Sequence, residues 1–160
     1  MAENFSAAPR RLIVVLDTNA LVRVALAKSP LARVLRCSLE RGDFVLLTSG
    51  DILNEIGRVL CYPRIAIHHA LSEAAIEEFE LAVRKAAVVV PGLYVVRKIE
   101  ADPSDDMFLA CALEGDADYI VSEDPHVRDL KTYQGIQIIS MAQFSEKLGL
   151  SVARPASPQT

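Results

Sequence analysis

Short apolar runs alternate with helical segments along almost the whole chain. Residues 12–16 form a continuous apolar run, and residues 44–47, 119–122 and 136–139 are shorter runs of the same kind. A strand that is buried on both faces of a parallel sheet has this appearance. Strands that alternate with helices predict a single α/β domain, with a mainly parallel central sheet and helices on both faces.

The segments between these runs have helical patterns and clear stop signals. Residues 88–96 are β-branched but are interrupted by Pro91-Gly92, so they form either a short strand or a connection. We expect a flexible segment over residues 1–10, the domain over residues 11–149, and a flexible tail over residues 150–160. The expected helices cover residues 18–27, 30–40, 51–60, 72–86, 103–114, 125–130 and 141–148.

Composition narrows the class of protein. The 160 residues suit one domain, and no stretch approaches the ~18 consecutive apolar residues of a membrane span. The start of the chain lacks the apolar run of a secretory signal, and three widely spaced cysteines suit a reducing compartment, so we expect a cytoplasmic protein without a membrane partner. The net charge of −4 argues weakly against broad electrostatic binding of nucleic acid. Carboxylates that hold a cation would also make the net charge negative, and the bound cation would reverse the sign of the charge locally.

Acidic residues follow two of the predicted strands. Asp17 comes directly after residues 12–16, and Asp124 comes shortly after residues 119–122. Either residue alone could be a helix N-cap. The carboxyl ends of parallel strands meet at one edge of a sheet, and carboxylates gathered there repel one another unless a cation joins them. Oxygen ligands of this kind suit Mg²⁺ or Mn²⁺.

Helical geometry separates the adjacent residues Asp105 and Asp106. Asp105 shares a helix face with Phe108, Leu109 and Ala112, so it should point inward at the top of the sheet. Asp106 lies about 100° round the helix and should sit at the rim. The alternative for Asp105 is that it only accepts hydrogen bonds from the first turn of its helix.

Glu55 is open to two interpretations. It lies at the border of the apolar arc of its helix. It could reach the carboxyl edge of the sheet, or it could pair with Arg58 or Arg23 as a solvated charge. Asp51 is the alternative position on the same helix.

These residues resemble the motifs of PIN-domain ribonucleases, particularly the VapC-like toxins of bacterial toxin–antitoxin modules. The resemblance covers roughly residues 11–148. The matching pieces, in order, are Val15-Leu16-Asp17-Thr18-Asn19, Glu55-Ile56-x-x-Val59-Leu60, Asp102-Pro103-Ser104-Asp105-Asp106-x-Phe108-Leu109 and Ala117-Asp118-Tyr119-Ile120-Val121-Ser122-Glu123-Asp124.

The resemblance implies an α/β/α fold and a Mg²⁺ or Mn²⁺ site of acidic residues. It further implies that Ser122 helps to hold water or metal and that Asn19 orients the first acid. Asp106, next to Asp105, is a possible further site residue. Glu123 departs from the pattern, because many relatives have a small residue there, and it adds negative charge beside the site. The implied catalytic and metal-binding residues are Asp17, Glu55, Asp105 and Asp124.

The function that the resemblance implies is a divalent-metal-dependent endoribonuclease that cleaves single-stranded RNA with a metal-activated water. The resemblance suggests the toxin of a type II toxin–antitoxin pair, with a homodimer and an antitoxin protein as expected partners. One alternative is an RNA-processing nuclease without an antitoxin. Another is a non-catalytic module of this fold that binds metal or RNA.

Overall fold

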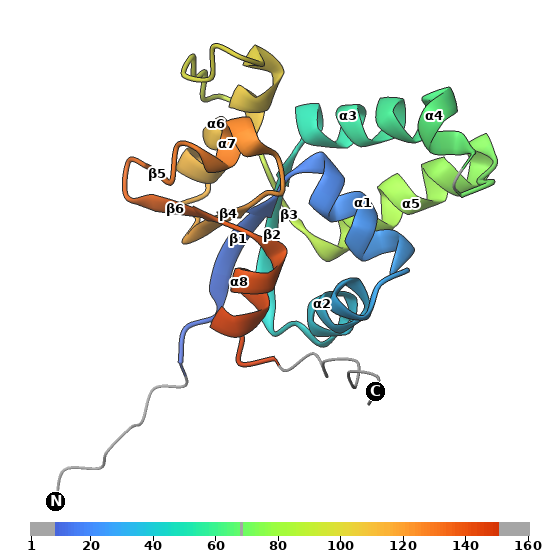
Figure 1. Ribbon diagram of the computed structural model, residues 1–160, viewed down its shortest axis with the longest axis horizontal. Coiled ribbons are helices and arrows are strands. Elements are labelled where there is room, and N and C mark those ends of the chain that lie inside the picture. The colour runs from blue at the N-terminus through green and yellow to red at the C-terminus, as the bar shows by residue number, and fades with distance from the viewer. Residues whose placement is uncertain (1–8, 68, 151–160) are drawn as a thin grey trace, which may run out of the picture.

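A six-stranded sheet forms the centre of the computed structural model, which describes residues 9–67 and 69–150 (Figure 1). The strand order is β3-β2-β1-β4-β6-β5, and every pairing is parallel except that of β5 with β6. The predicted fold class is therefore confirmed. The strands are β1 (Leu12–Leu16), β2 (Phe44–Ser49), β3 (Val88–Val90), β4 (Tyr119–Val121), β5 (Thr132–Tyr133) and β6 (Ile136–Ile139).

The predicted helices are present with small shifts at their ends. Two short elements, α4 and β5, were not predicted, and the segment expected to be helical from residue 103 begins as a 3₁₀ turn, η1. The expected flexible ends lie mostly outside the described residues. The helices are α1 (Thr18–Leu26), α2 (Pro30–Arg41), α3 (Gly50–Cys61), α4 (Pro63–Ala66), α5 (Glu73–Ala86), η1 (Pro103–Asp105), α6 (Asp106–Glu114), α7 (Pro125–Arg128) and α8 (Met141–Lys147).

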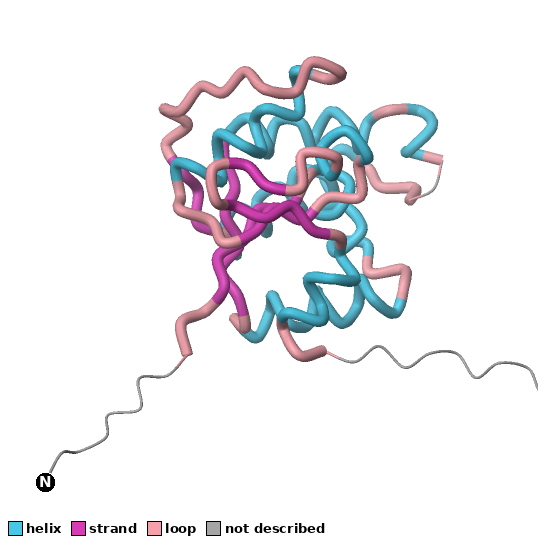
Figure 2. Tube along the Cα trace, turned by 60° about the vertical axis from the view of Figure 1, so that its left-hand side comes forward, coloured by secondary structure: helices cyan, strands magenta, loops and turns pink. Residues whose placement is uncertain are grey.

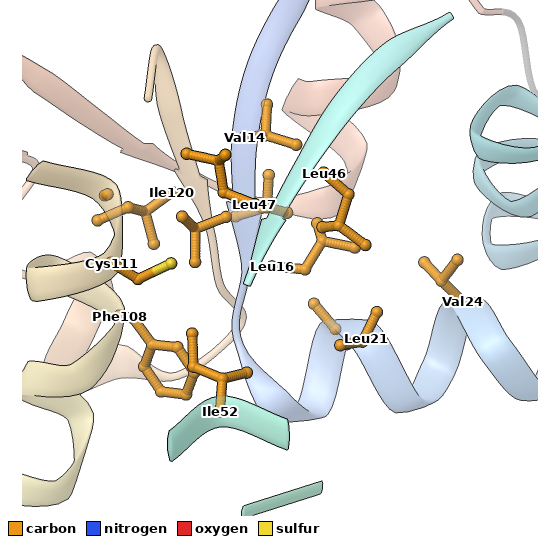
Figure 3. Close-up of a cluster of buried hydrophobic side chains, with 14 of the residues drawn as sticks. Val14, Leu16, Leu21, Val24, Leu46, Leu47, Ile52, Phe108, Cys111 and Ile120 are labelled. Atoms are coloured by element: carbon orange, nitrogen blue, oxygen red, sulfur yellow. The ribbon is translucent and has the colours of Figure 1, made fainter. Parts of the chain in front are cut away.

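The core lies on both faces of the sheet, between the groups of helices seen in Figure 2. Figure 3 shows Leu16 and Leu46 on the face toward α1, and Leu47 on the opposite face with Phe108 and Cys111 of α6. Neighbouring residues of a strand point to opposite faces, so both members of the pair 46–47 are buried. This two-sided burial explains why β1 and the start of β2 appear as unbroken apolar runs.

Packing at the end of α6 leaves no room for a side chain at Gly115. A Cβ atom there would lie 2.3 Å from Leu47 Cδ1 and 3.2 Å from Val90 Cγ1. The glycine therefore allows the end of α6 to approach β2 and β3 closely.

The parallel topology brings the carboxyl ends of β1 and β4 together. Val14 pairs with Tyr119 and Leu16 pairs with Val121. The Asp17 N–H then donates to the Val121 carbonyl at 3.0 Å, so the backbone beyond β1 stays joined to β4. The residues that follow these strands are consequently neighbours, although about 100 positions separate them in the sequence.

The ambiguous segment 88–96 contains only the short strand β3 at the edge of the sheet. Beyond it, residues 91–102 form an irregular connection, which reaches past α6 in Figure 1. Within residues 9–67 and 69–150, no helix combines the length and the apolar character that crossing a membrane requires.

Candidate active site

A cavity of about 340 Å³ at the carboxyl edge of the sheet is lined by all four predicted acids. Asp17 lies between β1 and α1, Glu55 on α3, Asp105 at the end of η1, and Asp124 at the start of α7. Four separate elements thus each supply one carboxylate. We call this space the acidic cavity.

Asp17 is almost fully buried, at 3% exposure, and two hydrogen bonds orient it. One carboxylate oxygen accepts from the Ala20 N–H at 2.7 Å, so Asp17 is the N-cap of α1. The other accepts from the Ser122 hydroxyl. Burial raises the Asp17 pKa above its ordinary value, and the charges of Asp124 and Glu123 raise it further against these two hydrogen bonds. Asp17 therefore caps α1 and also lines the acidic cavity.

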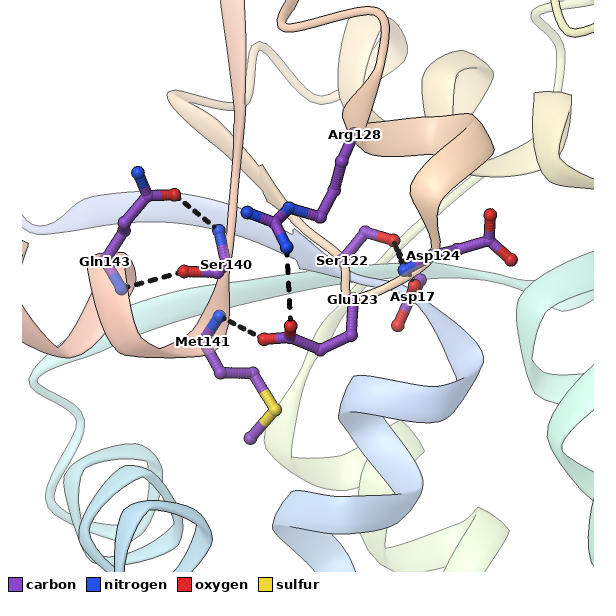
Figure 4. Close-up of polar contacts among 8 residues, drawn as sticks. All are labelled: Asp17, Ser122, Glu123, Asp124, Arg128, Ser140, Met141 and Gln143. Carbon is purple, nitrogen blue, oxygen red and sulfur yellow. Dashed lines mark hydrogen bonds and ion pairs between the residues drawn. The ribbon is translucent and has the colours of Figure 1, made fainter.

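Ser122 connects two of the acids. It is fully buried, and its oxygen accepts from the Asp124 N–H at 3.0 Å while its hydroxyl donates to Asp17 (Figure 4). Asp124 in turn accepts from the His126 N–H at 2.8 Å and caps α7. Asn19 is exposed on the wall of the acidic cavity, so the contacts that orient Asp17 are those of Ala20 and Ser122.

Glu123 points away from Asp124 in Figure 4. Its carboxylate accepts from the Met141 N–H at 2.8 Å at the start of α8, and it lies 3.8 Å from Arg128. An anion at a helix N-terminus is stabilised there by the helix dipole. Glu123 still raises the Asp17 pKa, but it is the smallest of the contributions to that shift.

Asp105 has the most perturbed carboxylate of the site. Its Oδ2 atom is buried and has no hydrogen-bond partner among the described residues. Burial raises its pKa from the ordinary 3.8 to about 7, and the charges of Asp102, Asp124 and Asp17 act in the same direction. The three other aspartates are thus close enough to Asp105 to repel its charge.

The prediction that Asp106 sits at the rim of the site is wrong. It is buried rather than at the rim, and it lies outside the acidic cavity. Its carboxylate accepts from the backbone N–H groups of Lys98, at 3.1 Å, and Ile99, at 2.8 Å. Asp105 belongs to a 3₁₀ turn rather than to the α-helix, which changes the assumed phase, and the partners of Asp106 come from a distant connection.

Glu55 does both things that the sequence left open. It lines the acidic cavity, and its carboxylate forms an ion pair with the Arg58 guanidinium one turn along α3. Asp51, the alternative position, is exposed and lies outside this cavity.

The donor set fits a hard divalent cation in its chemistry. Every acid is an oxygen ligand, and the unpartnered Asp105 Oδ2 atom is a buried acceptor that a cation would satisfy. Among the residues that the structure describes, however, no three His, Cys, Asp or Glu side chains are drawn together closely enough to hold a metal ion. Glu55 is held instead by Arg58.

Part of the cavity wall was not predicted from the sequence. Tyr62 and Arg64, at the start of the unpredicted helix α4, line the acidic cavity, and Arg64 adds a cation to it. Proline is common at the first position of a helix, so Pro63 is a signal that could have identified α4. Asp102 also lines the cavity, and its carboxylate accepts from the Ser104 N–H at 3.1 Å.

Comparisons with known proteins agree with this architecture. A family model described as "PIN domain" matches residues 13–126. The crystal structure of PAE2754 from Pyrobaculum aerophilum matches with a TM-score of 0.58 and 17% identity, over 91% of this chain and 94% of that chain. At this identity the likeness concerns the fold alone. No curated protein shows significant similarity to the chain.

Proposed function

The chain belongs to the PIN-domain family, and we propose that it is a divalent-metal-dependent endoribonuclease that cleaves single-stranded RNA. PIN domains are generally nucleases that use divalent metals, so a hydrolase of phosphodiester bonds is the natural class. The specific activity is proposed from the site. On this proposal the protein acts in the cytoplasm, where its RNA substrate is available.

The observation that carries the proposal is the acidic cavity itself. Burial raises the pKa values of Asp17 and Asp105, and the charge of Asp124 raises both further. Such an arrangement costs stability unless a cation enters it, and perturbed carboxylates that face a cavity are typical of functional sites. Glu55 completes the set at the cavity wall.

Each of the site residues has its own proposed role. Asp17, Asp105, Asp124 and Glu55 would hold Mg²⁺ or Mn²⁺. When bound, such an ion lowers the pKa of a water molecule and neutralises negative charge on the phosphate. Ser122 keeps Asp17 and the backbone of Asp124 in register through its two hydrogen bonds. Exposed Arg64 on the cavity wall supplies a positive charge for the RNA backbone.

Cleavage of a mixed panel of single-stranded and duplex RNAs tests the proposal. We expect the wild-type chain to cut single strands with Mn²⁺ or Mg²⁺ and not with EDTA. Asp17→Asn should abolish cutting, while the control variant Asp129→Asn, at an exposed position outside the cavity, should cut normally. Metal-independent cutting, or an active Asp17→Asn variant, would contradict the assignment.

We also propose that the chain is the toxin of a type II pair and forms a homodimer. An apolar cavity of about 270 Å³ between α1, α2 and α5 supports a protein partner, since its wall includes Leu21, Leu39, Phe79 and Val83. Co-expression with the product of the neighbouring gene should then suppress cleavage. Light scattering that reports a monomer at micromolar concentration would end the dimer proposal.

A further inference from the structure

A second, larger hollow of about 640 Å³ adjoins the acidic cavity. Ser104 and Met107 form walls of both spaces. The larger one lies among α3, α6 and the connection after β3, and Tyr94 is part of its wall. We call it the Tyr94 groove.

The connection that carries Tyr94 is fixed at both of its ends by α6. Near its start, the Glu114 carboxylate accepts from the N–H groups of Gly92, at 3.1 Å, and Leu93, at 3.0 Å. Near its end, Asp106 accepts from the N–H groups of Lys98 and Ile99. Tyr94 lies between these two anchors and is 53% exposed, so its ring is open to solvent.

Three basic side chains lie in or beside the groove, together with several carboxylates. Arg58 lines the groove and is joined to Glu55 of the acidic cavity. Arg97 and Lys98 line a further hollow that shares Val95 and Val96 with the groove. Two of the groove's carboxylates, Asp106 and Glu114, accept hydrogen bonds from backbone N–H groups, and a third, Asp51, is exposed at its wall.

We propose that the Tyr94 groove is a nucleotide subsite for single-stranded RNA, in which a base next to the cleaved phosphate stacks on Tyr94. Arg58, Arg97 and Lys98 lie where they can meet the phosphates that flank this base. Aromatic platforms beside basic side chains are the usual means of binding single strands without strict sequence preference. This inference rests on the proposed function, because it takes the acidic cavity as the place of cleavage. A second copy of the chain is the rival occupant, and the test below separates the two.

Fluorescence anisotropy of a labelled single-stranded RNA tests the subsite without any need for cleavage. All variants are made in the full-length Asp17→Asn chain, in EDTA. Tyr94→Ala should weaken binding roughly 5- to 100-fold, which is the usual effect of losing one stacked base. Tyr94→Phe keeps the ring and should bind like the parent. Leu93→Ala is the matched control, since Leu93 is also exposed on the connection but does not line the groove.

An abasic nucleotide moved along the RNA gives a second readout. When the abasic nucleotide stands where a base would stack on Tyr94, it should weaken RNA binding by the parent by the same factor as Tyr94→Ala does. The Tyr94→Ala variant should bind this abasic RNA and the intact RNA equally well. Equal affinities for Tyr94→Ala and Leu93→Ala, or no binding of RNA by the parent, would overturn the subsite. A change of molecular mass in Tyr94→Ala without a change in RNA affinity would assign the ring to a protein interface and overturn it too.

The two proposals fail in different ways. A wild-type chain that binds RNA through Tyr94 but cuts none with Mn²⁺ would refute the nuclease and leave the subsite standing. A chain that cuts RNA equally well with and without Tyr94 would refute the subsite alone.

Discussion

The Ser122 hydroxyl donates a hydrogen bond to the buried carboxylate of Asp17, and so joins the ends of β4 and β1 at the acidic cavity. The same oxygen accepts from the Asp124 N–H. A single buried side chain therefore sets the relative position of two acids that lie more than 100 residues apart in the sequence.

Removing this hydroxyl should damage both stability and function. Ser122→Ala leaves one oxygen of Asp17 buried without a partner, which should lower the free energy of unfolding by about 1–3 kcal/mol. The Asp17 pKa should rise further, because the hydrogen bond to Ser122 lowers it in the native protein. Urea unfolding measures the first effect. Ser145→Ala is the control, since it removes another buried hydroxyl, which donates to the Ala142 carbonyl at 2.7 Å and does not line the acidic cavity. Normal RNA cleavage by Ser122→Ala would contradict its positioning role.

Stability without metal should fall as the pH rises from about 4 to about 7. Asp105 has a pKa of about 7 in the folded chain and 3.8 ordinarily, so in this window the folded state holds a proton that the unfolded state has lost. Its stabilising contribution is complete below pH 3.8 and is lost as the pH passes 7. Asp17, with its raised pKa, acts in the same direction.

Urea midpoints between pH 4 and pH 8 check this dependence in EDTA. Asp105→Asn should flatten the curve and should be at least as stable as wild type at pH 8, because the amide carries no charge. The exposed control Asp129→Asn should keep the wild-type slope. A wild-type curve that rises over this window would show that the carboxylates are not destabilised in the fold.

The adjacent acids should have opposite roles. Asp106→Ala removes the acceptor of the Lys98 and Ile99 N–H groups, so it should lower the free energy of unfolding by about 1.5–3 kcal/mol. Asp105→Asn should instead abolish cleavage and leave the fold intact. Chemical unfolding and cleavage per folded molecule separate the two effects. An Asp106→Ala variant that is fully stable but inactive would move the metal site by one residue.

Mn²⁺ should raise the melting temperature of the wild-type chain, since a cation offsets the repulsion among the acids. At 100 times the dissociation constant the gain is about 2.7 kcal/mol. The melting temperature in Ca²⁺-free buffer with EDTA is the reference. Mn²⁺ should raise the melting temperature of Asp105→Asn much less than that of the wild-type chain. Equal shifts in the two proteins would mean that the ion binds elsewhere.

Most strands and helices, and the positions of Asp17 and Asp124, could be predicted because their signals are local. A strand buried on both faces needs an unbroken apolar run, and an acid directly after such a strand must lie at the carboxyl edge of the sheet. Asp17 and Asp124 follow that rule, whereas Glu55 and Asp105 were expected from the resemblance to PIN-domain nucleases, and all four line one cavity. Sequence periodicity thus determined the layers and the position of the site.

Tertiary structure alone decided what each acid contacts. Asp106 is buried because its partners are Lys98 and Ile99, and Glu123 turns from the cavity because the start of α8 at Met141 lies beside it. These partners are up to 18 positions away and have no periodic relation to the acids. Hydrogen bonds of this kind depend on which separate elements lie next to each other in the fold. The local pattern of the sequence does not show which elements these are.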